Sequence, residues 1–268
     1  MNIVGQEKLV EELTRIFKIF KASNCFIRPH FILTGESGTG KTLTVSTLCN
    51  QLDLNFLEIN AAQLTKEGTS GNSLSKALTP LLQFGSLPTV VFVDEFDKLF
   101  ISGNSNSDLA HESTNGVQNE FLKVLESDSS SVYGDYGKYV NASTSNVLFV
   151  FAGSFNGEKD ITLDKLRKFG VKTEFLGRVG LVYNTVPLTL EHLYVILEES
   201  SLLDKYLQLF KKNKEDIVPV LKSYIKQNFD KNTLGARQVS TIIHQYFIKG
   251  GLEQEEVQKV TFQSTLEF

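Results

Sequence analysis

The stretch GESGTGKT, residues Gly35 to Thr42, decides the fold of this chain. It matches the pattern GxxxxGK[S/T], in which glycines let backbone N–H groups turn inward around bound phosphates. The apolar run HFILTG before it predicts a buried strand, and a helix is expected to begin at Lys41 and continue through LTVSTLCNQL. A strand, this loop and a helix, in that order, predict a nucleotide-binding site. The alternative, a chance glycine loop, is disfavoured because both flanking elements are correct.

The residues of this loop have distinct expected roles. Lys41 is expected to reach the β- and γ-phosphates of a nucleotide, and the Thr42 hydroxyl is expected to hold Mg²⁺. Backbone N–H groups and the positive end of the following helix would bind the phosphate oxygens. The predicted cofactors are therefore ATP and Mg²⁺, and the predicted cofactor-binding residues of the loop are Gly35, Glu36, Ser37, Gly38, Thr39, Gly40, Lys41 and Thr42.

A second chemical feature is the acidic end of the apolar run VVFVDE. Asp94 would lie at the carboxyl-terminal edge of a sheet, where ligands of open α/β sheets bind, and would hold Mg²⁺ through water. Glu95 can polarise an attacking water molecule, which is the role of a general base. The alternative is a capping pair at the end of a strand, and the accompanying phosphate loop makes that alternative less favoured.

Strands and helices alternate through the first two thirds of the chain. Leu9, Leu13, Ile16 and Phe20 have helical spacing and predict an amphipathic helix over residues 6–20. The runs NFLEIN, TVVFVDEFDKL and NVLFVFAGS predict three further strands, and VQNEFLKVLE predicts a helix. This alternation predicts an α/β fold with a parallel sheet that is covered on both faces.

The pattern changes after Pro187. Residues 188–249 have no strong strand pattern and predict several helices, followed by a short strand near KVTFQS. We therefore expect a large domain over residues 1–186 and a small, mainly helical domain over residues 187–268. The segments ISGNSNSD and ESDSSSVYGDYGKYVNASTS are rich in Ser, Asn and Gly, and predict mobile loops.

Composition limits the class of protein. The formal net charge of −4 argues mildly against a protein whose main task is to bind nucleic acid. Cys25 and Cys49 lack metal-binding spacing, so we expect buried, reduced thiols of a cytosolic protein, with a disulfide or a metal site as the weak alternative. The first residues do not read as a signal peptide, and no run approaches 18 uninterrupted apolar residues. We expect a soluble, cytoplasmic protein with no membrane partner.

Together these motifs resemble the AAA+ ATPases, and finer details are similar to the ClpX and HslU branch of the Clp unfoldases. VGQEKLVEEL resembles the box whose apolar residues, here Ile3 and Val4, line the adenine pocket. VDEFDKL and GVQNEFLKVLE are similar to the Walker B segment and the helix after it. NVLFVFAGSF resembles the sensor 1 strand, which implies that Ser154 lies near the γ-phosphate, with Asn156 as the alternative.

Two further boxes imply arginines that act on the nucleotide. KFGVKTEFLGRV resembles the arginine-finger box, so Arg178 would project into the nucleotide of a neighbouring subunit. TLGARQV resembles the sensor 2 motif, so Arg237 would contact the nucleotide of its own subunit. Arginine fingers stabilise the charge that develops on the γ-phosphate and contribute roughly 10³–10⁵ in rate. The alternatives are a surface salt bridge for Arg178 and a helix-packing cation for Arg237.

The segment LTKEGTSG departs from the resemblance. In that branch a GYVG-type loop lines a central pore and its aromatic residue grips polypeptide, whereas the aligned residues here are Gly68, Thr69, Ser70 and Gly71. A threonine offers little apolar area, so gripping by an aromatic is expected to be impaired. Tyr133, Tyr136 and Tyr139 could replace it, although simple surface packing is the favoured reading of these tyrosines. No IGF-type tripeptide for docking a peptidase and no cysteine-rich N-terminal domain is seen, so delivery to a protease is not expected.

The matching motifs run in family order from residue 3 to about residue 240. They imply a parallel-sheet P-loop NTPase large domain with a small C-terminal helical lid. They also imply a homo-oligomeric ring, with six subunits as the family expectation, and the catalytic residues Glu95, Arg178, Arg237 and Ser154.

The function predicted from these motifs is ATP-driven remodelling or disassembly of a protein or protein–DNA complex. The alternative is a nucleotide-switched scaffold or loader that acts on nucleic acid or a partner protein. Lys66, Thr69, Ser70 and Asn72 are donors of the kind that contact phosphates, which leaves nucleic acid as a less favoured partner. An inactive relative is the least favoured reading, because Lys41, Asp94, Glu95 and Arg178 are all present.

Overall fold

The computed structural model describes residues 3–66, 71–100, 108–134 and 137–252, and for residues 108–114 it describes the backbone alone. The chain divides into two compact units. One unit comprises residues 8–36 and 41–185, and the other comprises residues 1–7, 37–40 and 186 onward. The predicted loop at residues 101–107 and the predicted strand near KVTFQS lie outside the described residues.

The first unit contains a five-stranded sheet with the strand order β2-β3-β6-β1-β7, and every neighbouring pair of strands is parallel. Ile32 pairs with Phe151 and Val182, which fixes the register of the three strands at one side of the sheet. Because the strands are parallel, their carboxyl ends meet at one edge, where Thr34, Asp94 and Gly153 end β1, β3 and β6. The strands are β1 Phe31–Thr34, β2 Asn55–Asn60, β3 Thr89–Asp94, β6 Val147–Gly153 and β7 Leu181–Asn184.

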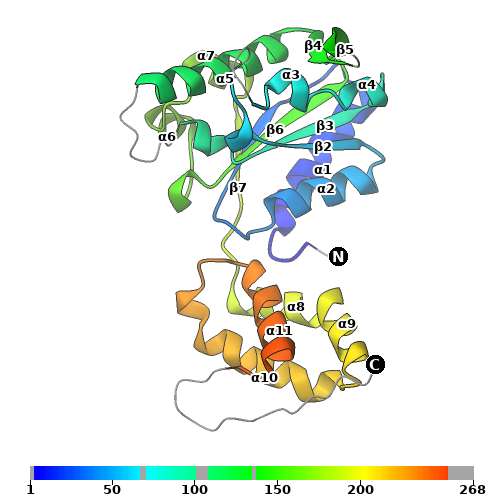
Figure 1. The fold of residues 1–268 in the computed structure, drawn as a ribbon, viewed down its shortest axis with the longest axis vertical. Coiled ribbons are helices and arrows are strands. Elements are labelled where there is room, and N and C mark those ends of the chain that lie inside the picture. Colours follow the sequence, from blue (N-terminus) through cyan, green and yellow to red (C-terminus); the bar gives the residue numbers. More distant parts are fainter. Residues whose placement is uncertain (1–2, 67–70, 101–107, 135–136, 253–268) are drawn as a thin grey trace. The chain divides into compact units, whose positions relative to one another are not determined.

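Helices cover both faces of this sheet (Figure 1). Side chains alternate between the faces of a strand, so Phe31 and Leu33 pack toward α1 and α2, while Ile32 packs toward α5, α6 and α7. The α/β fold predicted from the sequence is confirmed. The helices of this unit are α1 Glu7–Ala22, α2 Lys41–Gln51, α3 Leu74–Ala77, α4 Leu81–Phe84, α5 Asp108–Glu126, α6 Leu163–Lys168 and α7 Thr173–Arg178, with the 3-10 turns η1 Ala61–Gln63, η2 Phe96–Leu99 and η4 Phe155–Gly157.

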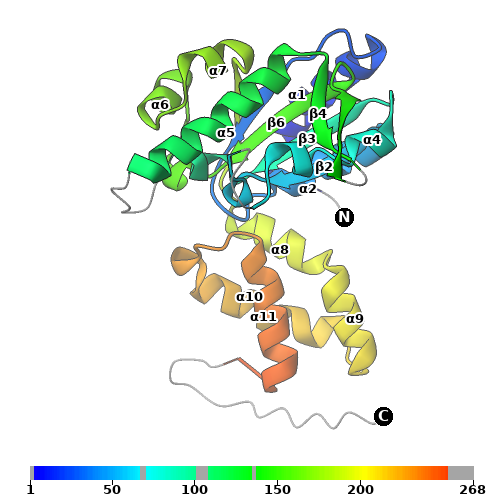
Figure 2. The same cartoon turned by 45° about the horizontal axis from the view of Figure 1, so that its top comes forward.

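The segment ESDSSSVYGDYGKYVNASTS is not simply a mobile loop, so that prediction was wrong for its described part. It forms an antiparallel hairpin of β4 Ser129–Tyr133 and β5 Tyr139–Ser143. Val132 and Ala142 are buried and belong to the same apolar core as α5 and β6, which holds one face of the hairpin on the unit. The serine-rich sequence shows no strand pattern, because the hydrophobic face of the hairpin comes only from the tertiary contacts of Val132 and Ala142. Figure 2 shows the hairpin beside α3 and α4.

The second unit contains a separate helical core. Leu193, Leu203, Leu221 and Ile243 are fully buried at its centre, one from each of four helices. Pro219 lies inside the third of these helices, in its first two turns. The helices are α8 Leu190–Glu198, α9 Ser201–Leu209, α10 Lys214–Gln227 and α11 Arg237–Lys249, with the 3-10 turn η5 Phe229–Lys231. Among the described residues, no helix is both long and apolar enough to cross a membrane.

Candidate nucleotide-binding site

The phosphate loop is built by glycines in conformations that other residues avoid. Gly35, Gly38 and Gly40 have φ values of 144°, 76° and 92°. A Cβ atom on Gly35 would lie 1.8 Å from Thr185 Oγ1, so no side chain fits between the end of β1 and the residue after β7. The loop therefore follows β1 as a tight turn and leads directly into α2, as the motif predicts.

The lysine of the motif lies against its own loop. Lys41 is the first residue of α2 and is half-buried, and its Nζ donates to the carbonyl oxygens of Gly35 at 2.7 Å and Glu36 at 3.0 Å. These contacts hold the ammonium group against the loop, and phosphate oxygens are acceptors of the same kind as these carbonyls. Thr42 follows on the first turn of α2 and is also half-buried.

Two carboxylates meet at the end of β3 with different environments. Asp94 is half-buried, and its Oδ1 accepts a hydrogen bond of 2.8 Å from the Glu95 N–H. Glu95 is exposed and has a left-handed backbone with a φ of 53°, which is unusual for a residue other than glycine. The chain turns away from the strand direction at Glu95, directly after Asp94. The side chains of Asp94 and Glu95 are therefore not required to point to opposite faces of the sheet, as successive residues of a strand do.

A third carboxylate near Asp94 was missed by the sequence analysis. Glu58 on β2 lies beside β3, where Asn60 pairs with Asp94. Partial burial, and after it the charge of Asp94, raise the pKa of the Glu58 carboxyl above its usual range. The alternation of NFLEIN marks Glu58 as a polar strand residue, but only the strand order shows that it lies near Asp94.

The donor set at this sheet edge fits a magnesium ion. Thr42 supplies a hydroxyl and Asp94 supplies a half-buried carboxylate, and both are the hard oxygen ligands that Mg²⁺ prefers. Mg²⁺ is usually held by one or two protein oxygens together with substrate phosphates and water, so a larger cluster of protein ligands is not required. The charge of Asp94, which after burial is the second cause of the raised Glu58 pKa, also favours a cation at this sheet edge.

The end of β6 is tied to a buried acid that the sequence analysis did not select. Asp97 is 1% exposed, and its Oδ2 accepts hydrogen bonds of 3.1 Å from both Ser154 Oγ and the Phe155 N–H. Ser154 is therefore occupied by Asp97, whereas Asn156 is exposed and has a left-handed φ of 59°. Neither side chain is assigned the sensor role by these contacts. The motif VDEFDKL contained Asp97, but nothing in the sequence distinguished it from a surface acid.

Arg178 lies at the last position of α7 and is about half exposed. Its Nη2 donates to Glu126 Oε1 at 2.9 Å, and both side chains are close to 50% accessible, at 53% and 48%. Such pairs contribute only about 0–1 kcal/mol to stability, so this arginine is available for other partners.

In the second unit, Gln6 and the segment TLGARQV contact residues 37–40 of the loop. Arg237 Nη1 donates to Ser37 Oγ at 2.9 Å, and the Ala236 N–H donates to the carbonyl oxygen of Gly38 at 3.0 Å. Gln6, which is buried, donates to the Val186 carbonyl at 2.7 Å and accepts from the Val186 N–H at 2.9 Å. Gln6 was quoted in the VGQ box but not chosen as a site residue.

The remaining predicted residues are placed only in part. Ile3 and Val4 are half-buried. Of the predicted pore loop, Gly68, Thr69 and Ser70 lie outside the described residues, whereas Gly71 is exposed with a φ of 139°.

Comparison with known proteins agrees with this geometry. Residues 31–175 match the family described as "ATPase family associated with various cellular activities (AAA)". The chain is 28% identical to the ATP-dependent Clp protease ATP-binding subunit ClpX of Bacteroides fragilis, over 90% of this chain and 69% of that protein. It is 32% identical to ClpX 2 of Wolinella succinogenes over 68% of this chain and 55% of that protein. It is 26% identical to ClpX of Treponema denticola over 86% of this chain and 67% of that protein.

Proposed function

Because the chain belongs to the AAA family of ATPases and is of the ClpX type, we propose that it couples ATP hydrolysis to remodelling of a protein or protein–DNA complex. The chain is a nucleotide-binding ATPase, as predicted. Assembly as a homo-oligomeric ring, with six subunits expected, and the use of Mg²⁺ are parts of the proposal.

The observation that carries the proposal is the meeting of the phosphate loop and the acidic strand end at one edge of the sheet. Lys41 comes after β1, Asp94 is the last residue of β3 and Glu95 follows it directly, all in the same unit. In this arrangement Lys41 binds phosphate oxygens, Thr42 and Asp94 hold Mg²⁺, and the exposed Glu95 orients the attacking water. Mg²⁺ would supply charge neutralisation at the β- and γ-phosphates.

The arginines support action as an oligomer. Arg178 is half-exposed, and among the described residues its only ion pair is a weak one at the surface, which fits a side chain that serves a neighbouring subunit. Arg237 contacts Ser37 of the phosphate loop, which fits a contact with the nucleotide of the same chain. Ser154, held by Asp97, would act by positioning the end of β6 rather than by direct contact.

The direct test is to capture what the ring holds. Glu95→Gln protein, which is expected to bind ATP without turning it over, is mixed with ATP and a cell extract and then purified by an affinity tag. A specific protein or protein–DNA complex retained with ATP, released with ADP and absent with Lys41→Ala protein supports remodelling. Identical material in all three samples would contradict it.

Whether polypeptide is pulled is a separate part of the proposal. Thr69→Tyr supplies the aromatic residue that the aligned loop lacks. If this loop faces a pore, the variant gains ATP-dependent unfolding of a tagged reporter protein, with Thr69→Val as the matched control. Equal activity of Thr69→Tyr, Thr69→Val and wild type would argue that the loop does not contact the substrate.

A scaffold or loader acting on nucleic acid is the second candidate. The specific observation in its favour is the pair of lysines, Lys66 and Lys76, that flank the presumed pore loop. Binding of a short DNA duplex that weakens steeply with added salt would support this candidate, because phosphate contacts release counterions.

A further inference from the structure

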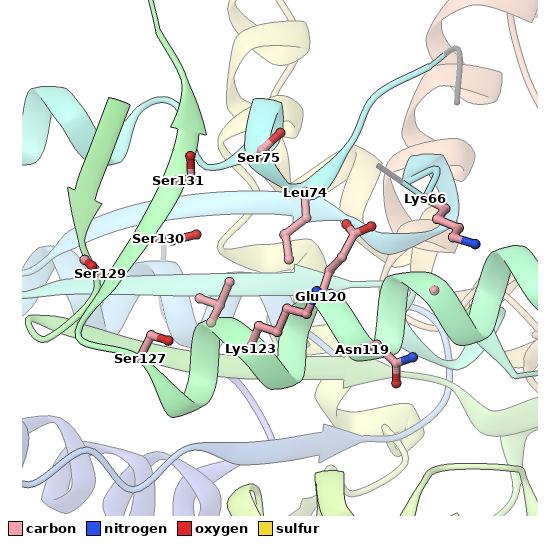
Figure 3. Close-up of a pocket in the computed structure, with 12 residues that line it drawn as sticks. Lys66, Leu74, Ser75, Asn119, Glu120, Lys123, Ser127, Ser129, Ser130 and Ser131 are labelled. Atoms are coloured by element: carbon pink, nitrogen blue, oxygen red, sulfur yellow. The ribbon is translucent and has the colours of Figure 1, made fainter. Parts of the chain in front are cut away.

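A cleft of about 490 Å³ lies beside the hairpin, between β4, α3 and the carboxyl-terminal half of α5 (Figure 3). Ser129, Ser130 and Ser131 line it along β4, and Lys123 lines it from α5. All of these elements belong to the first unit. No step of ATP hydrolysis proposed above uses the cleft.

Within the described residues, no strand pairs with the edge of β4 that faces the cleft. The hairpin sheet has only the order β4-β5, and Figure 3 shows β5 on the side of β4 opposite to the cleft. A strand edge that is not covered presents N–H and C=O groups that can pair with another chain.

The hydrogen bonds of the hairpin identify which residues present these groups. The Gly134 N–H donates to the Lys138 carbonyl at 2.8 Å, and the Thr144 N–H donates to the Asp128 carbonyl at 2.9 Å. In an antiparallel pair the bonded residues alternate, so residues 128, 130, 132 and 134 bond to β5, whereas 129, 131 and 133 point their backbone groups outward.

The outward direction is confirmed at the end of the strand. The carbonyl oxygen of Tyr133 accepts a hydrogen bond of 2.6 Å from Thr79 Oγ1, which lies just after α3. No such bond is formed by the backbone of Ser129 or Ser131 with any other part of the described chain. These two residues therefore offer two donors and two acceptors, about 7 Å apart along the strand, to an incoming strand.

Side chains around the cleft favour an acidic ligand. Among the described residues that line it are two lysines, Lys66 and Lys123, and one carboxylate, Glu120. A Cβ atom on Gly116 of α5 would lie 2.8 Å from Lys66 Cδ, so the absence of a side chain at Gly116 lets the Lys66 stem lie across the helix. Lys123 is exposed and has no ion-pair partner within the described residues. The small serines of β4 leave room for the larger side chains of a ligand.

We propose that this cleft binds an extended polypeptide segment with acidic side chains, which adds to β4 as a strand by pairing with Ser129 and Ser131. Main-chain pairing would supply affinity with little sequence selectivity, and the lysines would favour acidic segments. This binding mode extends the proposed function, because it describes how a partner polypeptide is held. It rests on that function only in taking the polypeptide to come from the complex that is remodelled.

The test uses a fluorescein-labelled ten-residue peptide of alternating valine and glutamate. Its binding to the full chain is followed by fluorescence anisotropy at low salt and without nucleotide. The matched peptide carries N-methyl groups on alternate backbone amides along the edge that would pair, and a second matched peptide has lysine in place of glutamate. We expect N-methylation to weaken binding by at least about tenfold, since each lost hydrogen bond accounts for a several-fold change. We expect the lysine peptide to bind more weakly still.

Two pairs of protein variants locate the site. Ser131→Pro removes an outward N–H and leaves the bonds to β5 in place, because proline is tolerated at a strand edge whose N–H faces solvent. It should weaken binding about threefold to tenfold, whereas Ser131→Ala should bind as wild type does. Lys123→Glu should weaken binding at low salt and less so at high salt, whereas Lys18→Glu on α1 should have no effect.

Several results would overturn the inference. One is that the N-methylated peptide binds as tightly as the unmodified one, and another is that Ser131→Pro binds the peptide as tightly as wild type does. A third is that, without peptide, the amides of residues 129–131 become more protected from hydrogen exchange as the protein concentration rises. That result would assign the cleft to a second copy of the chain. ATP hydrolysis is measured in parallel on each variant and should be unchanged. If the wild-type protein hydrolyses ATP but does not bind the valine–glutamate peptide, this site alone is refuted. If the wild type does not hydrolyse ATP, the proposed function is refuted.

Discussion

At the scale of single residues, neighbouring acids in one short segment do different work. Asp94 ends β3 at the sheet edge and Glu95 follows it, whereas Asp97 turns back into the core and binds the start of η4. The left-handed backbone at Glu95 separates the two directions. The acidic segment therefore has one part at the edge of the sheet and another part that holds the residues after a neighbouring strand.

Glu95→Gln should abolish turnover and keep nucleotide binding. The amide has nearly the same shape as the carboxylate but cannot accept a proton, so hydrolysis should fall by about 10²-fold or more. Steady-state phosphate release and binding of a fluorescent ATP analogue measure the two properties, with Glu11→Gln on the exposed face of α1 as control. Hydrolysis at the wild-type rate would remove Glu95 from the mechanism.

His30 should make stability depend on pH. Burial, and after it the charge of Arg28, lower the pKa of His30 from 6.5 to about 4, and its Nδ1 accepts from the Phe149 N–H at 3.0 Å. Between pH 6.5 and 4 the unfolded chain binds more protons than the native one, so stability is complete above this window and decreases as the pH falls through it.

We expect this loss to be about 2 kcal/mol, measured by urea unfolding at pH 7 and pH 4.5. His30→Asn keeps an acceptor near the Nδ1 position and does not titrate, so its pH dependence should be smaller by that amount. An equal slope in both proteins would assign the effect to other groups.

At the scale of elements, the sheet edge depends on links between consecutive strands and turns. Asp97 of η2 binds the residues that follow β6, and a Cβ atom on Gly153 would lie 2.8 Å from Asp97 Oδ1. The glycine at the end of β6 and the acid of η2 therefore fit each other, and they fix the positions of the β3 and β6 ends.

Asp97→Ala should destabilise the protein and lower hydrolysis together. It leaves the Phe155 N–H and the Ser154 hydroxyl without their acceptor, which should reduce the free energy of unfolding by about 2 kcal/mol or more. Lys98→Ala is the matched control, since its 3.9 Å pair with Asp97 involves a half-exposed ammonium group and contributes little. Similar urea midpoints for Asp97→Ala and Lys98→Ala would contradict this role.

The hairpin shows how an element can be hidden in a polar sequence. The segment from Ser129 to Ser143 has few apolar residues, and a composition rule predicts a loop. Val132 and Ala142 nevertheless give it one buried face, and Thr79 binds its end. Burial against α5 and the sheet, which no local pattern records, decides that it forms strands.

At the scale of the whole molecule, the site is expected to be completed by a neighbouring copy. Arg178→Ala subunits should hydrolyse ATP slowly because their neighbours receive no finger, and Glu95→Gln subunits should be inactive because they lack the base. In a one-to-one mixture, about a quarter of the interfaces would join an intact Glu95 to an intact Arg178.

Hydrolysis by that mixture should therefore exceed the activity of either variant alone. Phosphate release is measured as the ratio of the two proteins is varied, with Arg167→Ala, which removes an exposed ion pair on α6, in place of Arg178→Ala as control. No recovery at any ratio, under conditions where the subunits exchange, would contradict action between subunits.

The sequence by itself determined the class of fold, and it predicts the chemistry of the nucleotide site. GESGTGKT and VVFVDE are local sequence motifs, because their predicted function depends on residue types within a few positions and on the strand or helix beside them. The family is likewise determined by the order of such motifs.

Tertiary structure decided what depends on residues far apart in the chain. It paired Asp97 with Ser154 and brought Glu58 beside Asp94. It also left the outward edge of β4 at Ser129 and Ser131 without a partner among the residues that the structure describes. Each of these follows from strand order, burial or hydrogen-bond alternation across the molecule. These properties arise only when distant segments pack against each other, so no short stretch of the sequence predicts them.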